Sequence, residues 1–333
     1  MMRRRDFITL IGSATAAWPL TARAQQTGRL PTIGWLDVID PNSGPSEVLA
    51  GFKQGLAEQG YVVGRNVNLE IHSAQGDAEM RALVADLVRR QVAVIVITGG
   101  AAAQAAKAAT PSIPIVFIMG GDPVEEGLVT SLNRPGGNLT GIAILATEIA
   151  AKRLELLHEL VPKAESIAAL VQSEGPDSSD FSRAQSKGYQ SAALALGVRL
   201  LLVKAATESD IAGALANAVQ QHAGALLVGG TQPFAVAQMP QILSLANRYA
   251  LPTMFLRSNA VVAGALASYG TDPLESFRQV GVYTGRILKG EKPADLPVVQ
   301  STKFEFVINL KTAKALGLQV SQDMLSIADE VIE

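Results

Sequence analysis

The residues best placed for chemistry in this chain follow its predicted β-strands. The set after the apolar run at 93–98 is Thr98, Gly99, Gly100 and Ala101. Two successive glycines let backbone N–H groups approach a ligand, and a helix starting near Ala101 would direct its positive end at the same point. That arrangement would suit a carboxylate, although the glycines could equally serve only a tight strand-to-helix turn.

A second candidate set follows the run IVFIM at 115–119 and consists of Gly121, Asp122 and Pro123. Asp before Pro is typical of a helix start, with Asp122 as the N-cap and Pro123 at the first helical position. The sequence therefore predicts a short helix over 124–132. Asp122 could instead face a ligand, where its carboxylate could pair with an ammonium group.

Further candidates lie at or just after other predicted strands. Trp35 could fill the core or stack on a planar ligand, which we favour, and Tyr269 offers the same choice with a hydroxyl added. The candidates in the second half of the chain are Gln172, Ser173, Glu174, Thr231, Gln232 and Ser258. Ligands of open parallel sheets bind beyond the carboxyl ends of the strands, so we expect these side chains to meet at one site.

The sequence shows no recognisable catalytic or metal-binding set. The chain has no cysteine, and its three histidines, His72, His158 and His222, lack the spacing of a zinc site. Neither a G-x-S-x-G nucleophile elbow nor a dinucleotide or P-loop glycine motif occurs. We therefore expect neither an enzyme nor a cofactor, with a carboxylate-based hydrolase as the remaining enzymatic alternative.

The elements that must position these residues alternate between short β-branched runs and longer Ala/Leu-periodic segments. This alternation is typical of βαβ units and predicts an α/β fold with parallel sheets. Strands are predicted at 32–36, 67–72, 93–98, 115–119 and 139–144, and a similar rhythm then begins again. The two sets predict two Rossmann-like lobes. The elements after 252 are too few for a third domain, so the chain must return to lobes already formed.

The first 24 residues have the layout of a cleaved secretory signal. Three arginines at 3–5 precede an apolar stretch at 8–20, and an A-x-A cleavage site ends at Ala24. We expect cleavage after Ala24 and a periplasmic protein, exported by the general route or, given the paired arginines, by the twin-arginine route. Cleavage removes four arginines and Asp6, which changes the net charge from −2 to −5 and argues against nucleic acid as a partner.

Four long runs carry a resemblance to a known family. They are GDPVEEGLVTSLNRPGGNLTGI (121–142), KRLELLHELVP (152–162), ALASYGTDPLESFRQVGVYTGRILKGEKPADLPV (265–298) and KFEFVINLKTAKALGL (303–318). The chain resembles the substrate-binding proteins of ABC transporters, which have the type I periplasmic binding protein fold and include tryptophan-type amino-acid binders. The resemblance implies three hinge crossovers, near 143, 253 and 299. Lobe one would comprise 30–143 plus 254–298, and lobe two 144–253 plus 299–333.

The resemblance also implies a solute-binding component of an ABC importer. Such a protein closes two lobes on a small carboxylate-bearing solute, here an amino acid or an aromatic or branched acid, and delivers it to a membrane permease. We expect a monomer. The loops at 172–176 and 230–233 depart from the family's usual sequences, which leaves the identity of the solute open. The alternatives are a periplasmic sensor subunit that signals through a membrane partner and an exported hydrolase. A repressor is disfavoured because the signal occupies the place of a DNA-binding domain.

Overall fold

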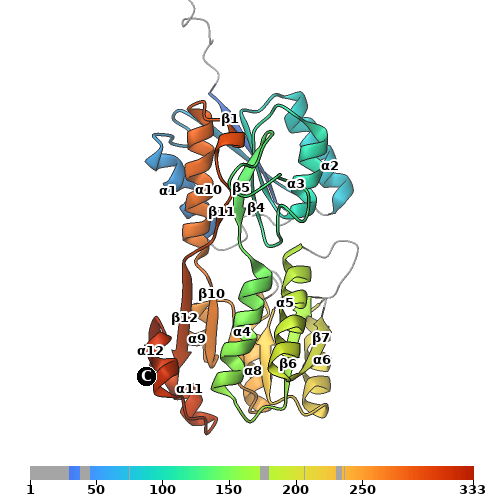
Figure 1. The fold of residues 1–333 in the computed structure, drawn as a ribbon, viewed down its shortest axis with the longest axis vertical. Coiled ribbons are helices and arrows are strands. Elements are labelled where there is room, and N and C mark those ends of the chain that lie inside the picture. Colours follow the sequence, from blue (N-terminus) through green and yellow to red (C-terminus); the bar gives the residue numbers. More distant parts are fainter. Residues whose placement is uncertain are drawn as a thin grey trace, which may run out of the picture.

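The computed structural model describes residues 30–37, 46–74, 76–172, 180–205, 207–229, 235 and 237–333. Within them, two sheets form two lobes, each covered by helices on both faces (Figure 1). Lobe one is the upper lobe in Figure 1 and lobe two the lower. The predicted α/β fold with two lobes is confirmed, whereas the predicted signal at 1–24 lies outside the described residues.

Lobe one contains six parallel strands in the order β11-β5-β4-β3-β1-β2. Its strands are β1 (Thr32–Asp37), β2 (Asn68–Ser73), β3 (Val94–Thr98), β4 (Ile115–Met119), β5 (Leu139–Ala143) and β11 (Val299–Gln300), the last preceded by a 3-10 turn at Pro293–Asp295. Helices α1 (Ser46–Glu58) and α10 (Pro273–Leu288) cover one face, and α2 (Asp77–Arg89) and α3 (Gly100–Ala109) cover the other (Figure 1). Successive residues of β3 therefore enter two different hydrophobic cores.

Lobe two contains seven strands in the order β13-β12-β10-β9-β8-β6-β7, in which β10 and β12 run antiparallel and the other pairs parallel. Its strands are β6 (Ser166–Gln172), β7 (Arg199–Ala205), β8 (Ala225–Val228), β9 (Thr253–Phe255), β10 (Ala267–Thr271), β12 (Phe304–Asn309) and β13 (Glu330–Ile332). Its helices are α4 (Ala146–Leu160), α5 (Asp180–Leu196), α6 (Glu208–Gln220), α8 (Met239–Arg248), α9 (Ser258–Val262), α11 (Leu310–Ala315) and α12 (Gln322–Ile327). Helices α4 and α5 pack on one face of this sheet, and α6 and α8 pack on the other.

The chain crosses between the lobes after β5, after β10 and after β11. The second crossover thus lies near 272 rather than near 253, and the assignment of 254–271 to lobe one is wrong. Strand β9 pairs with β8, and β10 pairs with β9, so the sheet of lobe two holds this segment by its backbone hydrogen bonds. The described parts of lobe one fall within 30–143 and 272–300, and those of lobe two within 144–271 and 301–333.

Helices α1 and α10 approach each other backbone to backbone. Each carries two glycines four residues apart at the contact, Gly51 and Gly55 on α1 and Gly281 and Gly285 on α10. A Cβ added to Gly51 or Gly55 would overlap a carbonyl oxygen of α10, and one added to Gly281 would overlap a carbonyl oxygen of α1. These positions need glycine because of the close approach, which any larger residue would prevent.

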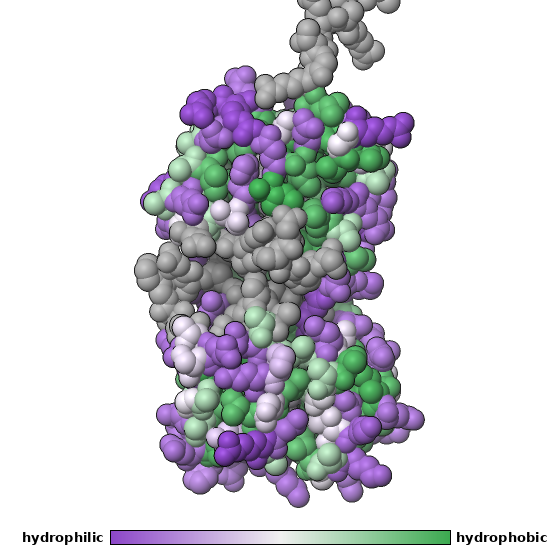
Figure 2. All heavy atoms as spheres, turned by 180° about the vertical axis from the view of Figure 1, so that it is seen from behind, coloured by the Kyte–Doolittle hydropathy of each residue, from purple (hydrophilic) through white to green (hydrophobic). Residues whose placement is uncertain are grey.

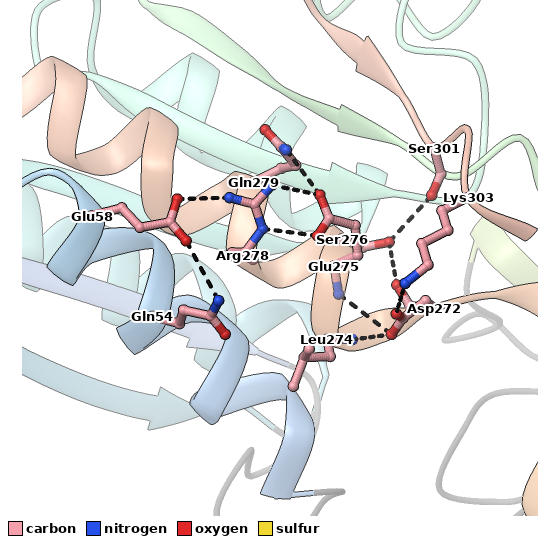
Figure 3. Close-up of polar contacts among 10 residues, drawn as sticks. All are labelled: Gln54, Glu58, Asp272, Leu274, Glu275, Ser276, Arg278, Gln279, Ser301 and Lys303. Atoms are coloured by element: carbon pink, nitrogen blue, oxygen red, sulfur yellow. Dashed lines mark hydrogen bonds and ion pairs between the residues drawn. The ribbon is translucent and has the colours of Figure 1, made fainter.

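The second and third crossovers are attached to each other (Figure 3). Asp272 caps α10 by accepting a hydrogen bond from the backbone N–H of Leu274 at 2.9 Å, and its Oδ2 lies 3.1 Å from Nζ of Lys303. The hydroxyls of Ser276 and Ser301 lie 3.2 Å apart. Because Ser301 and Lys303 belong to the third crossover, these contacts hold it against the start of α10.

Arg278 on α10 binds one carboxylate of its own helix and one of α1 (Figure 3). Its Nη2 donates to Glu275 at 2.7 Å and its Nη1 donates to Glu58 on α1 at 2.6 Å. Hydrogen bonds to a carboxylate favour its ionised form, so Arg278 lowers the pKa of Glu275 from an ordinary 4.5 to about 2. The ionised Glu275 therefore holds the Arg278 side chain, which in turn bonds to Glu58 of α1.

Arg153 joins four elements of lobe two and is completely buried. Its Nη1 donates to the hydroxyl of Tyr189 on α5, and its Nη2 donates to the carbonyl oxygens of Val228 at 2.7 Å and Met254 at 2.9 Å. Burial lowers the pKa of this guanidinium. Because Arg153 lies on α4, the element that follows the first crossover is bonded to α5, β8 and β9.

The described helices include none with the length and apolar character needed to span a bilayer. On the face shown in Figure 2, hydrophobic residues gather over part of lobe one, and the described surface of lobe two is mostly hydrophilic. Exposed apolar side chains such as Leu194 are usual on folded proteins when they are scattered.

The contact between α1 and α10 predicts a large effect of a single methyl group. Gly55→Ala is expected to destabilise the protein by about 1–3 kcal/mol, because the added Cβ must displace the backbone of α10. Urea unfolding measures this change. Gly213→Ala is the matched control, since Gly213 lies in the exposed middle of α6 with open space around it, and this change should stabilise by up to about 1 kcal/mol. An unchanged or raised midpoint for Gly55→Ala would contradict the role of the contact.

The low pKa of Glu275 predicts a pH-dependent contribution to stability. Its carboxyl is depressed in the folded state, so the contribution is fully present above about pH 4.5 and is lost as the pH falls toward 2. The difference in unfolding free energy between the wild type and Arg278→Met should therefore shrink between pH 6 and pH 2.5, as measured by urea titrations. Arg248→Met, at an exposed site on α8, should show no such convergence, and parallel curves for both variants would refute the prediction.

Candidate functional site

The carboxyl ends of the neighbouring strands β1 and β3 bring Asp37 and Thr98 together. The Thr98 hydroxyl donates a hydrogen bond to Oδ2 of Asp37 at 3.1 Å. Asp37 is 5% exposed, so a carboxylate lies just beneath this edge of lobe one. Because the hydroxyl proton is directed at Asp37, the Thr98 oxygen presents its lone pairs to the site. The sequence candidates missed Asp37, although its place at the end of a strand was a usable signal.

The turn after β3 has the predicted strand-to-helix form. Gly99 has a φ of 95°, which favours glycine, and α3 begins at Gly100. The carboxylate of Glu126 lies against this turn, since a Cβ on Gly100 would overlap its Oε2 and a Cβ on Gly121 would overlap its Oε1. Negative charge is favourable near a helix N-terminus, so Glu126 supplies the charge that we expected of a solute. A second carboxylate would be repelled here, which makes the turn unfavourable for a solute carboxylate.

Side chains of α3 hold the segment that carries Glu126. Nζ of Lys107 donates to the carbonyl oxygen of Gly127 at 2.6 Å, and Nε2 of Gln104 donates to the carbonyl oxygen of Glu126. Gln104 and Lys107 follow Gly100 by four and seven residues, so the three share one face of the helix. The backbone that carries Glu126 is thus bonded to α3, the helix whose first residues the Glu126 carboxylate contacts. Ala101, the last residue of the candidate set at 98–101, is exposed.

Residues 121–129 form turns rather than the predicted short helix. Oδ1 of Asp122 accepts hydrogen bonds from the backbone N–H of Val124 at 2.7 Å and of Glu125 at 3.3 Å. Gly127 has a φ of 67°, which interrupts any helical run. Asp122 therefore caps a turn, and the Asp122 side chain is exposed at the edge of lobe one. The neighbouring Pro123 is buried.

Trp35 fills the core of lobe one. Its ring is fully buried, stacks on Phe277 at 5.6 Å between centroids and meets Phe52 edge-on at 4.8 Å. The expectation that Trp35 stacks on a ligand is wrong, because the alternation of β1 directs this residue toward α1 and α10.

Tyr269 packs on lobe two's own sheet. It stacks on Phe304 at 5.7 Å between ring centroids and contacts Phe306 edge-on at 6.3 Å, and both phenylalanines lie on the paired strand β12. Burial raises the pKa of its hydroxyl. These contacts support the packing interpretation of Tyr269 over the ligand-binding one.

The remaining candidates belong to the second half of the chain. Gln172 ends β6 and Ser258 begins α9, and both are partly buried. Ser173, Glu174, Thr231 and Gln232 lie outside the described residues. The structure therefore describes two of these six candidates, one at the end of β6 and one at the start of α9.

Arg257, which the sequence candidates did not include, extends from lobe two to lobe one. It lies between β9 and α9, and its Nη2 pairs with Oε2 of Glu47 in the first turn of α1. The Arg257 side chain is 19% exposed and that of Glu47 is 46% exposed. Its Nη1 is shielded from solvent and has no hydrogen-bond partner among the described residues. The position two residues after a strand was the only sequence signal for it.

Helix α5 makes further contacts between the lobes. Phe181 of α5 packs on Gly120 at the end of β4, where an added Cβ would lie 2.6 Å from Cδ2 of the ring. Nζ of Lys187 lies 3.6 Å from Oε2 of Glu125 in the turn segment of lobe one, and both side chains are mostly exposed. Ion pairs of this kind contribute little free energy, so the ring contact carries more of this interface.

Metal chemistry finds no support in the described residues, where no three His, Asp or Glu side chains gather closely enough to hold an ion. His158 lies on α4, and its Nδ1 is buried without a hydrogen-bond partner in the described part of the chain. The candidate site thus consists of Asp37 and Thr98 at one strand end of lobe one, Glu126 beside the start of α3, and Arg257 of lobe two, which pairs with Glu47 of lobe one. Such charged and polar groups are suited to holding a polar molecule.

Residues 36–332 match the model of the family described as ABC transporter substrate binding protein. The chain belongs to this family. Its members are substrate-binding proteins rather than enzymes, which agrees with the non-enzymatic prediction from the sequence. The match spans both lobes and all three crossovers, so the fold and the family assignment rest on the same residues.

Individual relatives agree with this assignment. A tyrosine-binding protein from Clostridioides difficile (strain R20291) is 30% identical over 270 residues, which cover 81% of this chain and 76% of the relative. An ABC domain from Streptococcus pneumonia in complex with L-Trp is 28% identical, with a TM-score of 0.73 over 91% of this chain and 100% of that one. The ligand-free, open structure of a substrate-binding protein with adhesive properties from Clostridium difficile is 25% identical, with a TM-score of 0.63 over 91% and 99% of the two chains.

The cap at Asp122 predicts that the side-chain oxygen matters for stability and its charge does not. Asp122→Ala removes the acceptor for two backbone N–H groups and should destabilise by about 1 kcal/mol. Asp122→Asn keeps the acceptor and should unfold at nearly the wild-type urea concentration. An equal loss in both variants would show that the charge of Asp122 is needed for folding.

Proposed function

We propose that this protein is the periplasmic solute-binding component of an ABC importer and delivers a small carboxylate-bearing solute, an amino acid, to a membrane permease. The family assignment supports the binding role, and the two lobes joined by three crossovers support closure by hinge motion. Export with cleavage after Ala24, and a monomeric state, complete the proposal. The observation that carries it is the set of polar groups at the facing edges of the two lobes.

The charges of these polar groups favour a zwitterion as the solute. Lobe one presents acceptors, with the Thr98 oxygen and the Asp37 carboxylate at one strand end and the Glu126 carboxylate beside them. An ammonium group can donate to such oxygens and gains from their charge. The sequence had predicted a solute carboxylate at residues 98–101, and we now propose that the ammonium group lies at this edge instead. Relatives that bind tyrosine or L-Trp support an aromatic amino acid as the solute.

The amino-acid proposal predicts thermal stabilisation by solute. Protein freed of bound solute by unfolding, dialysis and refolding should melt at a higher temperature with L-tyrosine or L-tryptophan, because a ligand that binds only the folded state adds about 2.7 kcal/mol at a hundredfold excess over Kd. Glucose, which lacks both charges, is the control and should leave the melting temperature unchanged.

A panel of all common amino acids extends the test to other side chains. If none of them shifts the melting temperature of the refolded protein, the amino-acid proposal is wrong. Mass spectrometry of any solute released by the first unfolding step identifies the natural ligand independently of the panel.

A further inference from the structure

We infer that Arg257 binds the carboxylate of the solute and thereby selects amino acids over the corresponding amines. This inference rests on the proposed function and adds the group that recognises the second charge of a zwitterion. It begins from the polarity of lobe one, where Asp37, Glu126 and Thr98 all offer oxygen acceptors. These carboxylates repel a solute carboxylate, so we expect its donor to come from the other lobe.

Arg257 is placed to be that donor. It follows β9, so it stands at the carboxyl edge of the lobe-two sheet, where ligands of parallel sheets bind. Its guanidinium already reaches lobe one, because Nη2 pairs with Glu47 of α1. Glu47 itself lies in the first turn of α1, where the helix favours negative charge, so it is a stable anchor for one side of the guanidinium.

The other side of the guanidinium is unsatisfied. Nη1 of Arg257 is shielded from solvent without a hydrogen-bond partner among the described residues. Donors shielded in this way are rarely left unpaired in folded proteins, so an unpaired one indicates a place for a missing acceptor. A carboxylate oxygen is the strongest acceptor for a guanidinium, and a planar Arg held by Glu47 on one edge is pre-oriented to receive it on the other.

The test compares solutes that differ only in the carboxylate. Calorimetric titrations would use two pairs of probes, L-tyrosine with tyramine and L-tryptophan with tryptamine. The wild type should bind at least one amino acid about 10- to 100-fold more tightly than its amine, the order expected for a charge-assisted hydrogen bond. Arg257→Gln should lose this preference by weakening the amino acid alone. An unchanged affinity for the amine shows that the variant's site is folded.

Glu47→Gln is the control that separates solute binding from the contact between the lobes. It removes the ion pair with Arg257 but leaves the guanidinium in place, so the preference for the amino acid should persist. Equal losses in Glu47→Gln and Arg257→Gln, for amino acid and amine alike, would overturn the inference in favour of a purely interlobe role. A preference retained in Arg257→Gln, or absent from a wild type that binds both members of a pair, would overturn it as well. A wild type that binds no amino acid refutes the proposed function itself, and the inference with it.

Discussion

The close approach of α1 and α10 is the constraint on which the rest of the architecture depends. Helix α10 lies more than two hundred residues after α1, on the far side of a complete visit to lobe two, yet their backbones touch through Gly51, Gly55 and Gly281. This contact fixes lobe one as an assembly of separate chain segments. Since α10 begins at the second crossover, the same contact also fixes where the hinge lies relative to the first turn of α1.

The polarity of the site follows from contacts within the protein. The hydroxyl of Thr98 donates to Asp37, and the Glu126 carboxylate lies against Gly100 and Gly121, so this edge of lobe one is rich in acceptor oxygens. Lobe two contributes a guanidinium that is only half satisfied by Glu47. Opposite polarity on two surfaces that can close on each other is a simple physical basis for recognising a molecule with both charges.

The sequence predicted the fold well because alternating patterns and strand-to-helix turns are local. Strand β4 has the predicted bounds, and Gly99 stands where a tight strand-to-helix turn was expected. The errors arose where distant contacts decide the outcome. Because β10 pairs with β9, the second crossover lies later in the chain than predicted. Trp35 is buried in the core, and the positive φ of Gly127 prevents a helix after Pro123. No sequence motif marks Glu126 or Arg257 as a site residue, because the role of each depends on contacts with another element of the fold.

The attachment between the second and third crossovers has a mechanical consequence. Lys303 pairs with Asp272 and Ser301 contacts Ser276, so these two chain segments lie side by side and are linked at the hinge. Arg153 adds rigidity on the first crossover by bonding α4 into the body of lobe two. Two lobes joined by one separate segment and one linked pair of segments are expected to move relative to each other mainly by rotation about a single axis. Opening and closing can then proceed without twisting, so the groups on opposite lobes meet in the same alignment at each closure.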